Sequence, residues 1–190
     1  MQLYIQSGAK IIARRIKVVL SKHVSAEKFG FLEGRQIHEA IGVSWEGMHS
    51  LKTRKLKGAI LKIDLSKACD KVSWMYIQLL LTHLGFNIGS FCWIMRCISM
   101  VSFYVLINGA ASPFFHSERG LRQGCPLSPL LFLLVTEGLI RDISQAKRQG
   151  SLRGLQNLVG LQISHLLFVD DVLILCIRSI SDENSLRDIL

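Results

Sequence analysis

Three aspartates carry the clearest chemical signal in this chain. Asp170 and Asp171 are adjacent and stand between two apolar runs, and Asp64 stands in a run of Ile and Leu that alternates like a strand. Adjacent carboxylates repel each other and need a cation when they are partly buried. Their oxygens are the ligands that Mg²⁺ shares with substrate phosphates. An Asp-Asp pair also makes a good turn, so these residues alone leave a turn and a metal site both open.

The spacing of the aspartates suggests one reaction type. If the strand that carries Asp64 lies beside the segment that carries Asp170, both side chains can face one cleft. Carboxylates on neighbouring strands hold two Mg²⁺ ions about 3.5–4 Å apart in two-metal sites. One ion then activates an attacking hydroxyl and the other stabilises the leaving pyrophosphate, which suits nucleotidyl transfer.

The elements that position these residues can be read from hydrophobic periodicity and turn signals. Residues 58–65 alternate as a strand, with Lys62 and Asp64 on one face. Residues 163–169 and 172–177 predict a hairpin with both carboxylates at its tip. A second hairpin, 101–107 and 110–115, is joined by a type I′ Asn108-Gly109 turn. Helices are expected over 9–23, 37–51, from the Ser73 cap to Gly85, and from the Ser128 cap toward Gly150. This order predicts an α+β fold with a mainly antiparallel sheet.

Composition and charge narrow the class of protein. The 190 residues are 49% apolar and 19% charged, which excludes global disorder. The five cysteines are odd in number, with no CxxC pair and no leader before them, so we expect a reduced, intracellular protein. Residues 1–62 hold a formal charge of +8 and residues 63–190 hold +1. That excess fits either a polyanion-facing lobe or a solvated basic surface. Polar residues interrupt the poorly charged stretch 77–117, which therefore predicts buried core and no membrane span.

Five sequence blocks resemble those of LINE-type (non-LTR retrotransposon) reverse transcriptases, and within these the plant-like branch. The three central blocks are KIDLSKACDKVSW (62–74), RGLRQGCPLSPLLFLL (119–134) and ISHLLFVDDVLIL (163–175). GFLEGRQIHEAI (30–41) resembles the fingers block, and YVLINGAASPFFHSERG (104–120) the segment before the second central block. All five stand in the family's order, and the resemblance covers about residues 4–180.

The resemblance implies a right-hand polymerase with fingers and palm, an antiparallel palm sheet and flanking helices. The expected division is a basic fingers portion at 1–62, palm at 63–100, a fingers hairpin at 101–120 and palm again at 121–190, with the thumb absent. The implied activity is RNA-directed DNA polymerase, with an RNA template, a DNA primer, dNTPs and two Mg²⁺ ions, for which Mn²⁺ could substitute. The family implies the nucleus, although the chain shows no targeting signal.

The resemblance also assigns roles to individual residues. Asp64 and Asp170 match the principal metal ligands, assisted by the Leu65 carbonyl, and Asp171 matches the third palm aspartate. Positions that match nucleotide contacts are Arg35, Cys69 and Gln123. The expected nucleic-acid contacts are Lys52, Arg54, Lys55 and Lys57. Three residues depart from the family's usual pattern: Cys69 replaces an aromatic ring that crowds a ribose 2′-OH, Val169 replaces Ala, and Cys125 stands where Asp is common, although Cys also occurs there in this branch.

Other interpretations stay open at this level. The chain could be an inactive retroelement remnant that at most binds nucleic acid, and Cys69 leaves room for an RNA-templated RNA polymerase. Four aromatic residues of the predicted hairpin suit either base stacking or cross-strand packing: Phe103, Tyr104, Phe114 and Phe115.

Overall fold

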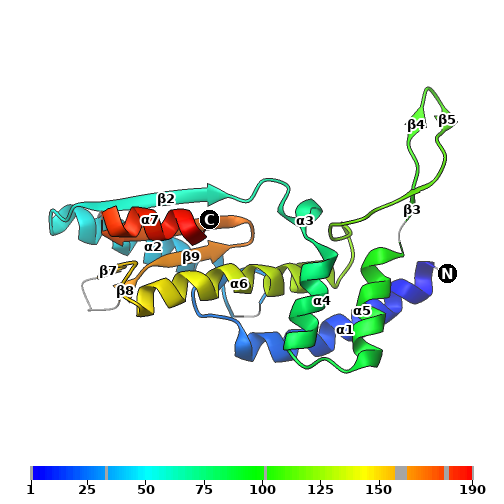
Figure 1. Cartoon of the computed structure of the whole chain (residues 1–190), viewed down its shortest axis with the longest axis horizontal. Coiled ribbons are helices and arrows are strands. Elements are labelled where there is room, and N and C mark those ends of the chain that lie inside the picture. Colours follow the sequence, from blue (N-terminus) through cyan, green and yellow to red (C-terminus); the bar gives the residue numbers. More distant parts are fainter. Residues whose placement is uncertain (1, 33, 101, 157–161, 178–179, 190) are drawn as a thin grey trace. The chain divides into compact units, whose positions relative to one another are not determined.

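Helices and mostly short strands follow one another without strict alternation in the structure, a computed structural model that describes residues 2–32, 34–100, 102–156, 162–177 and 180–189. The chain forms two compact units (Figure 1). Unit 1 comprises Met1–Lys22 and Lys67–Val135, and unit 2 comprises His23–Ser66 and Thr136–Leu190. The mixture of helices and sheets confirms the predicted α+β class.

Unit 2 is built on a four-stranded sheet in the order β1-β9-β10-β2. Its strands are β1 (Lys28–Phe29), β9 (His165–Phe168), β10 (Asp171–Ile177) and β2 (Gly58–Asp64). The β9–β10 and β10–β2 ladders are antiparallel, and the short β1–β9 ladder is parallel. The predicted strand at 58–65 and the predicted hairpin at 163–177 are therefore confirmed, whereas β1 lies in a segment for which no strand was predicted.

Helices cover both faces of this sheet (Figure 1). On one face, Ile140 and Ile143 of α6 (Ser128–Arg148) and Leu186 of α7 (Ile180–Ile189) pack against Val172 and Ile174 of β10. The other face holds the second core cluster: Phe29, Ala40 of α2 (Ile37–Thr53), Leu155 of β7 (Leu155–Gln156), Ile163 of β8 (Gln162–Ile163), Leu166 and Leu175. The alternation of side chains along β10 divides its apolar residues between the two layers.

Unit 1 contains most of α1 (Gln2–His23), the short α3 (Ala68–Lys71), α4 (Trp74–His83), α5 (Ile88–Ser99) and the start of α6. The predicted start and stop of α4 are confirmed, because the Ser73 hydroxyl accepts from the Tyr76 N–H and Gly85 follows with φ +73°. Ser128 is different. It lies inside α6, and its hydroxyl donates to the Arg122 carbonyl (2.7 Å).

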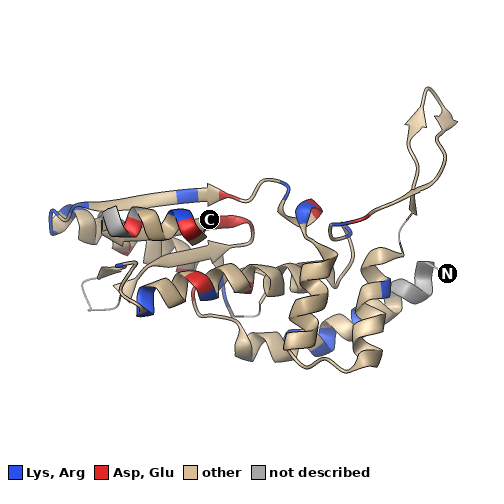
Figure 2. Ribbon diagram, in the orientation of Figure 1, with Lys and Arg blue, Asp and Glu red and all other residues tan. Residues whose placement is uncertain are grey.

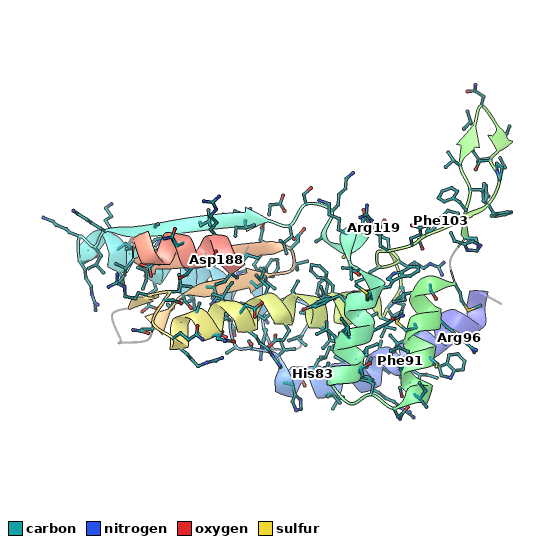
Figure 3. The ribbon with its side chains drawn as sticks, viewed as in Figure 1. His83, Phe91, Arg96, Phe103, Arg119 and Asp188 are labelled. Carbon is teal, nitrogen blue, oxygen red and sulfur yellow. The ribbon has the colours of Figure 1, made fainter. Side chains whose placement is uncertain are left out.

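The second hairpin of unit 1 is split into two short ladders, β3 (Ser102–Phe103) with β6 (Phe115–His116) and β4 (Leu106–Ile107) with β5 (Ala110–Ala111). Asn108 and Gly109 both have positive φ, which agrees with the predicted type I′ turn. The aromatic residues form cross-strand pairs, Phe103 with Phe115 and Tyr104 with Phe114. All four side chains are nevertheless exposed, and Figure 3 shows the hairpin's side chains projecting from its ribbon near Phe103.

The prediction that residues 77–117 are buried core is wrong. Helices α4 and α5 bury one stripe each, including Ile77, Leu81 and Ile94, while Ile88 is 76% exposed and Phe114 73% exposed. The reason is that apolar composition does not reveal whether both faces of an element have a partner. In the described part of the chain, no helix combines the length and apolar character that a membrane crossing requires.

Candidate functional site

The end of β2 and the start of β10 bring two of the three predicted aspartates together (Figure 2). Asp64 is the last residue of β2, Asp171 is the first residue of β10, and the two are register partners. The Leu65 N–H donates to the Asp170 carbonyl (3.1 Å), which makes Asp64 and Asp171 a non-hydrogen-bonded pair of the ladder. In such a pair the Cα atoms lie about 4.5 Å apart and the side chains share one face.

Asp170 lies in the turn of the β9–β10 hairpin. Because Asp171 pairs with Phe168, the two turn residues are Val169 and Asp170. The prediction that both carboxylates stand at the tip is thus wrong by one residue for Asp171. A two-residue break can be placed in either register, and the sequence does not distinguish 169–170 from 170–171.

Lys62 is a counter-ion of this carboxylate pair. Like charges directly opposite each other destabilise a sheet, and Lys62 lies two residues before Asp64 on the same face of β2. Its Nζ is 3.1 Å from Asp171 Oδ1, with the two side chains 64% and 42% exposed. An ion pair this exposed contributes about 1 kcal/mol at most. The pair therefore adds little stability, and it shows that a positively charged group can lie against the Asp171 carboxylate.

The donor chemistry fits a hard divalent ion, but the predicted three-carboxylate cluster is not formed. Asp64 and Asp171 present carboxylate oxygens, the type that Mg²⁺ prefers. Across the described ranges, no three His, Cys, Asp or Glu side chains gather closely enough to hold a metal ion. The structure supports a paired-carboxylate site, and metal binding stays a prediction.

Arg35, predicted to contact a triphosphate, binds backbone in this structure. Its guanidinium donates to the carbonyls of Val24 (3.1 Å), Ser25 and Lys28 (3.1 Å). These bonds hold the segment that leads into β1. The nucleotide contact stays a prediction.

The remaining predicted contacts are all solvent-accessible. Cys69 lies exposed on α3, where its carbonyl accepts from the Leu121 N–H (2.9 Å), and Gln123 lies in an exposed turn. Both belong to unit 1, whereas the aspartates belong to unit 2. The four basic residues of 52–57 are exposed at the end of α2 and in the turn before β2 (Figure 2).

A buried polar network that the sequence analysis missed anchors β1. Lys28 is fully buried, and its Nζ lies 3.7 Å from a Glu137 carboxylate oxygen. Glu137 also accepts from the Ser25 hydroxyl (2.7 Å) and pairs with Arg141 (3.4 Å). Burial lowers the pKa of Lys28 to about 7, against the opposing effect of Glu137. Because lysines are almost always exposed, nothing in the sequence signalled this arrangement.

A mainly antiparallel sheet with helices on both faces and carboxylates at the β2–β10 junction is the arrangement expected of the palm of a right-hand polymerase. Two telomerase structures share this fold. That of Candida albicans, in complex with a TWJ fragment of telomeric RNA, has a TM-score of 0.63 at 16% identity and covers 97% of this chain and 32% of its own. Apo telomerase from Candida tropicalis, truncated from its C-terminal domain, has a TM-score of 0.64 at 13% identity and covers 96% and 36%.

Residues 4–190 match the family Reverse transcriptase (RNA-dependent DNA polymerase), and the chain belongs to that family. It is 30% identical over 141 residues to the Pol polyprotein of the type-1 retrotransposable element R2 from Popillia japonica, covering 73% of this chain and 22% of the polyprotein. It is 29% identical over 129 residues to the transposon TX1 149 kDa protein of Xenopus laevis, covering 68% and 10%. These relatives support the predicted LINE-type branch.

A plant protein adds to this set. An uncharacterized mitochondrial protein of Arabidopsis thaliana is 49% identical over 72 residues, covering 36% of this chain and 59% of that protein. The chain spans about a fifth of the R2 polyprotein's length.

Proposed function

We propose that this chain is the catalytic core of an RNA-directed DNA polymerase of a LINE-type retroelement. The reaction is transfer of a dNMP from a dNTP to the 3′-OH of a DNA primer on an RNA template, and the carboxylates are those of Asp64, Asp170 and Asp171. The observation that supports the proposal is the direct pairing of Asp64 with Asp171 at the β2–β10 junction.

The proposed roles follow from where the side chains lie. Asp64 and Asp171 concentrate negative charge on one face, and the Leu65–Asp170 hydrogen bond ties the hairpin turn to the end of β2. Mg²⁺ bound by these carboxylates and the Leu65 carbonyl, as two ions with Mn²⁺ as substitute, would stabilise charge on the reacting phosphate. Arg35, Cys69 and Gln123 are proposed to contact the nucleotide. The basic segment 52–57 is proposed to contact nucleic-acid backbone.

A second candidate is a nucleic-acid-binding protein without catalysis. The Lys62–Asp171 ion pair and the missing three-carboxylate cluster in the part of the chain that the structure describes favour it. Such a protein would bind RNA or DNA in a salt-dependent way and synthesise no DNA.

Primer extension distinguishes the two. The purified chain, incubated with poly(rA)–oligo(dT), dTTP and Mg²⁺, is expected to incorporate dTMP. Asp64→Asn and Asp170→Asn should each lower incorporation by at least about 100-fold, because the carboxylates act as a unit. Asp188→Asn, an exposed change on α7, is the control and should leave incorporation unchanged. Incorporation that survives Asp170→Asn contradicts the proposed mechanism.

The same variants report on folding. Asp64→Asn removes a like-charged cross-strand pair, so it should raise the free energy of unfolding by roughly 0.2–1 kcal/mol while it abolishes incorporation. A urea titration measures this. A large loss of stability would show that the inactive variant is simply unfolded, and wild-type binding of RNA without synthesis would favour the second candidate.

A further inference from the structure

The turn that carries Asp170 contains a strained residue. Val169 has φ +55°, in the left-handed region that β-branched residues rarely adopt. Such conformations persist only where the surrounding structure imposes them, and they occur often at functional sites. The surroundings of Val169 therefore bear on where Asp170 stands.

Two neighbouring strands hold this turn. On one side the Val169 N–H donates to the Phe29 carbonyl at the end of β1 (3.5 Å). On the other side the Asp170 carbonyl accepts from the Leu65 N–H beyond β2 (3.1 Å). The turn thus forms a bridge between β1 and the strand that ends in Asp64.

The position of β1 is well determined because polar contacts hold residues 24–28, the segment that leads into it and includes its first residue. Arg35 binds three carbonyls of residues 24–28, and Ser25 and Lys28 both contact Glu137 of α6. The Leu167 N–H also donates to the Glu27 carbonyl (2.9 Å), which fixes β1 along β9.

Gly30, the residue after β1, faces the strained turn. A Cβ added to Gly30 would lie 3.0 Å from Val169 Cγ2 and 3.7 Å from Phe168 Cε2. The first distance is tighter than ordinary van der Waals contact, so a side chain at position 30 would press against the turn. Gly30 itself has φ +93°, which glycine adopts readily.

We propose that Gly30 is a positioning residue for the aspartate turn: its missing side chain leaves the space that Val169 Cγ2 needs, and so sets where Asp170 stands. Gly30 acts through Val169 and touches no reacting atom. The link to catalysis rests on the proposed function, whereas the link between Gly30 and metal binding at the aspartate turn does not require DNA synthesis.

Gly34 offers a matched control. It lies in the same loop with φ +77°, and an added Cβ would meet nothing within 4 Å. Gly30→Ala and Gly34→Ala therefore both place an L-residue at positive φ, but only Gly30→Ala adds an atom against Val169. The difference between the two variants isolates the contact.

The test measures Mn²⁺ binding by electron paramagnetic resonance, with Mn²⁺ alone as the probe, and the Mg²⁺ dependence of dTMP incorporation. Gly30→Ala should weaken Mn²⁺ binding about ten-fold, as loss of a ligand's support typically does, while Gly34→Ala changes it less than about two-fold. Adding Val169→Ala to Gly30→Ala removes Cγ2 and should restore most of the affinity, which a merely structural role of Gly30 would not predict.

Each outcome decides the inference. Equal Mn²⁺ affinities of Gly30→Ala and Gly34→Ala, or no rescue by Val169→Ala, overturn it. If Gly30→Ala does not fold, the double variant is compared with Val169→Ala alone: a folded protein with matching Mn²⁺ affinity supports the inference, and an unfolded one overturns it. A wild-type chain that binds Mn²⁺ but incorporates no dTMP contradicts the proposed function only. A wild-type chain that binds no Mn²⁺ removes both.

Discussion

The pairing of Asp64 with Asp171 works against local stability. Two carboxylates lie opposite each other at the end of an otherwise apolar ladder, and an exposed lysine compensates one of them. Residues that conflict with their local structure mark functional sites more often than structural ones. The Lys62–Asp171 ion pair agrees with a functional role of this site, because the lysine neutralises part of the negative charge and leaves the carboxylates exposed to solvent.

His165 is a second residue whose state depends on its surroundings. It is fully buried in β9, with Nδ1 2.9 Å from the Ser164 hydroxyl, and Nε2 has no hydrogen-bond partner among the described residues. Burial lowers the pKa of His165 to about 4. Of the nearby charged groups, Lys147 acts in the same direction and Glu27 and Glu137 oppose it. The imidazole is therefore neutral at physiological pH.

Acid should destabilise the protein through His165. The unfolded histidine takes up a proton near pH 6.5, whereas the folded one stays neutral until about pH 4. Stability is thus fully present above pH 6.5 and falls as the pH drops toward 4, by on the order of 2 kcal/mol at about pH 5. Urea titrations at about pH 7.5 and pH 5 measure the loss, and His165→Leu should remove it. The same pH dependence in wild type and variant would assign it to other groups.

The sequence predicts single residues well where their role is local. Alternation along 58–65 already placed Lys62 and Asp64 on one face, and the structure agrees. The contacts of Arg35 and Lys28 could not be predicted from the sequence because their partners depend on how distant segments pack. The steric fit of Gly30 against Val169 also joins positions more than a hundred residues apart.

Among the elements, most strong local signals agreed with the structure, although the predicted Ser128 cap did not, and the shortest elements gave no signal. Asn108-Gly109 predicted a turn that the structure contains, and Ser73 and Gly85 bounded α4 correctly. β1 has only two residues and gains its hydrogen bonds from β9, so no periodicity revealed it. The helix α7 was not anticipated either.

Helix α5 allows a test of one element. The Asn87 side chain accepts from the Ser90 N–H at 2.8 Å and so caps the helix. Asn87→Ala should lower the free energy of unfolding by about 1 kcal/mol, as measured by urea titration. Ser73→Ala should cost less, because its capping bond is longer (3.5 Å). Asn87→Asp keeps an acceptor and serves as control, and a loss equal to that of Asn87→Ala would show that capping is not the cause.

For the molecule as a whole, the excess of positive charge lies in one of the two compact units. Unit 1 contains ten Lys or Arg and two acidic residues, and unit 2 contains thirteen and twelve. The formal charges are therefore +8 and +1. Charge counted along the sequence places the excess in residues 1–62, but the structure divides those residues between both units. The predicted basic segment 52–57 lies in the nearly neutral unit, beside the aspartate-bearing strand.

Binding of a single-stranded RNA tests that segment. Alanine at Lys52, Arg54, Lys55 and Lys57 together should weaken binding and flatten the plot of log K against log salt by about 3, since each phosphate contact contributes roughly 0.7–0.9. Fluorescence anisotropy over a salt series measures both. The double change Arg148→Ala and Arg187→Ala removes exposed charge elsewhere and should barely alter the slope. An unchanged slope in the quadruple variant would contradict the assignment.

The strand that ends in Asp64 stands at the outer edge of its sheet, joined to β10 alone among the described strands. A border strand held by one ladder can detach while the strands behind it stay folded. Such partial opening would separate Asp64 from Asp171 without melting the core. The Asp64–Asp171 pair thus depends on a long strand that has, in the described part of the sheet, a neighbour on one side only. Any ligand that binds along the free edge of β2, such as a polynucleotide, would stabilise the paired arrangement.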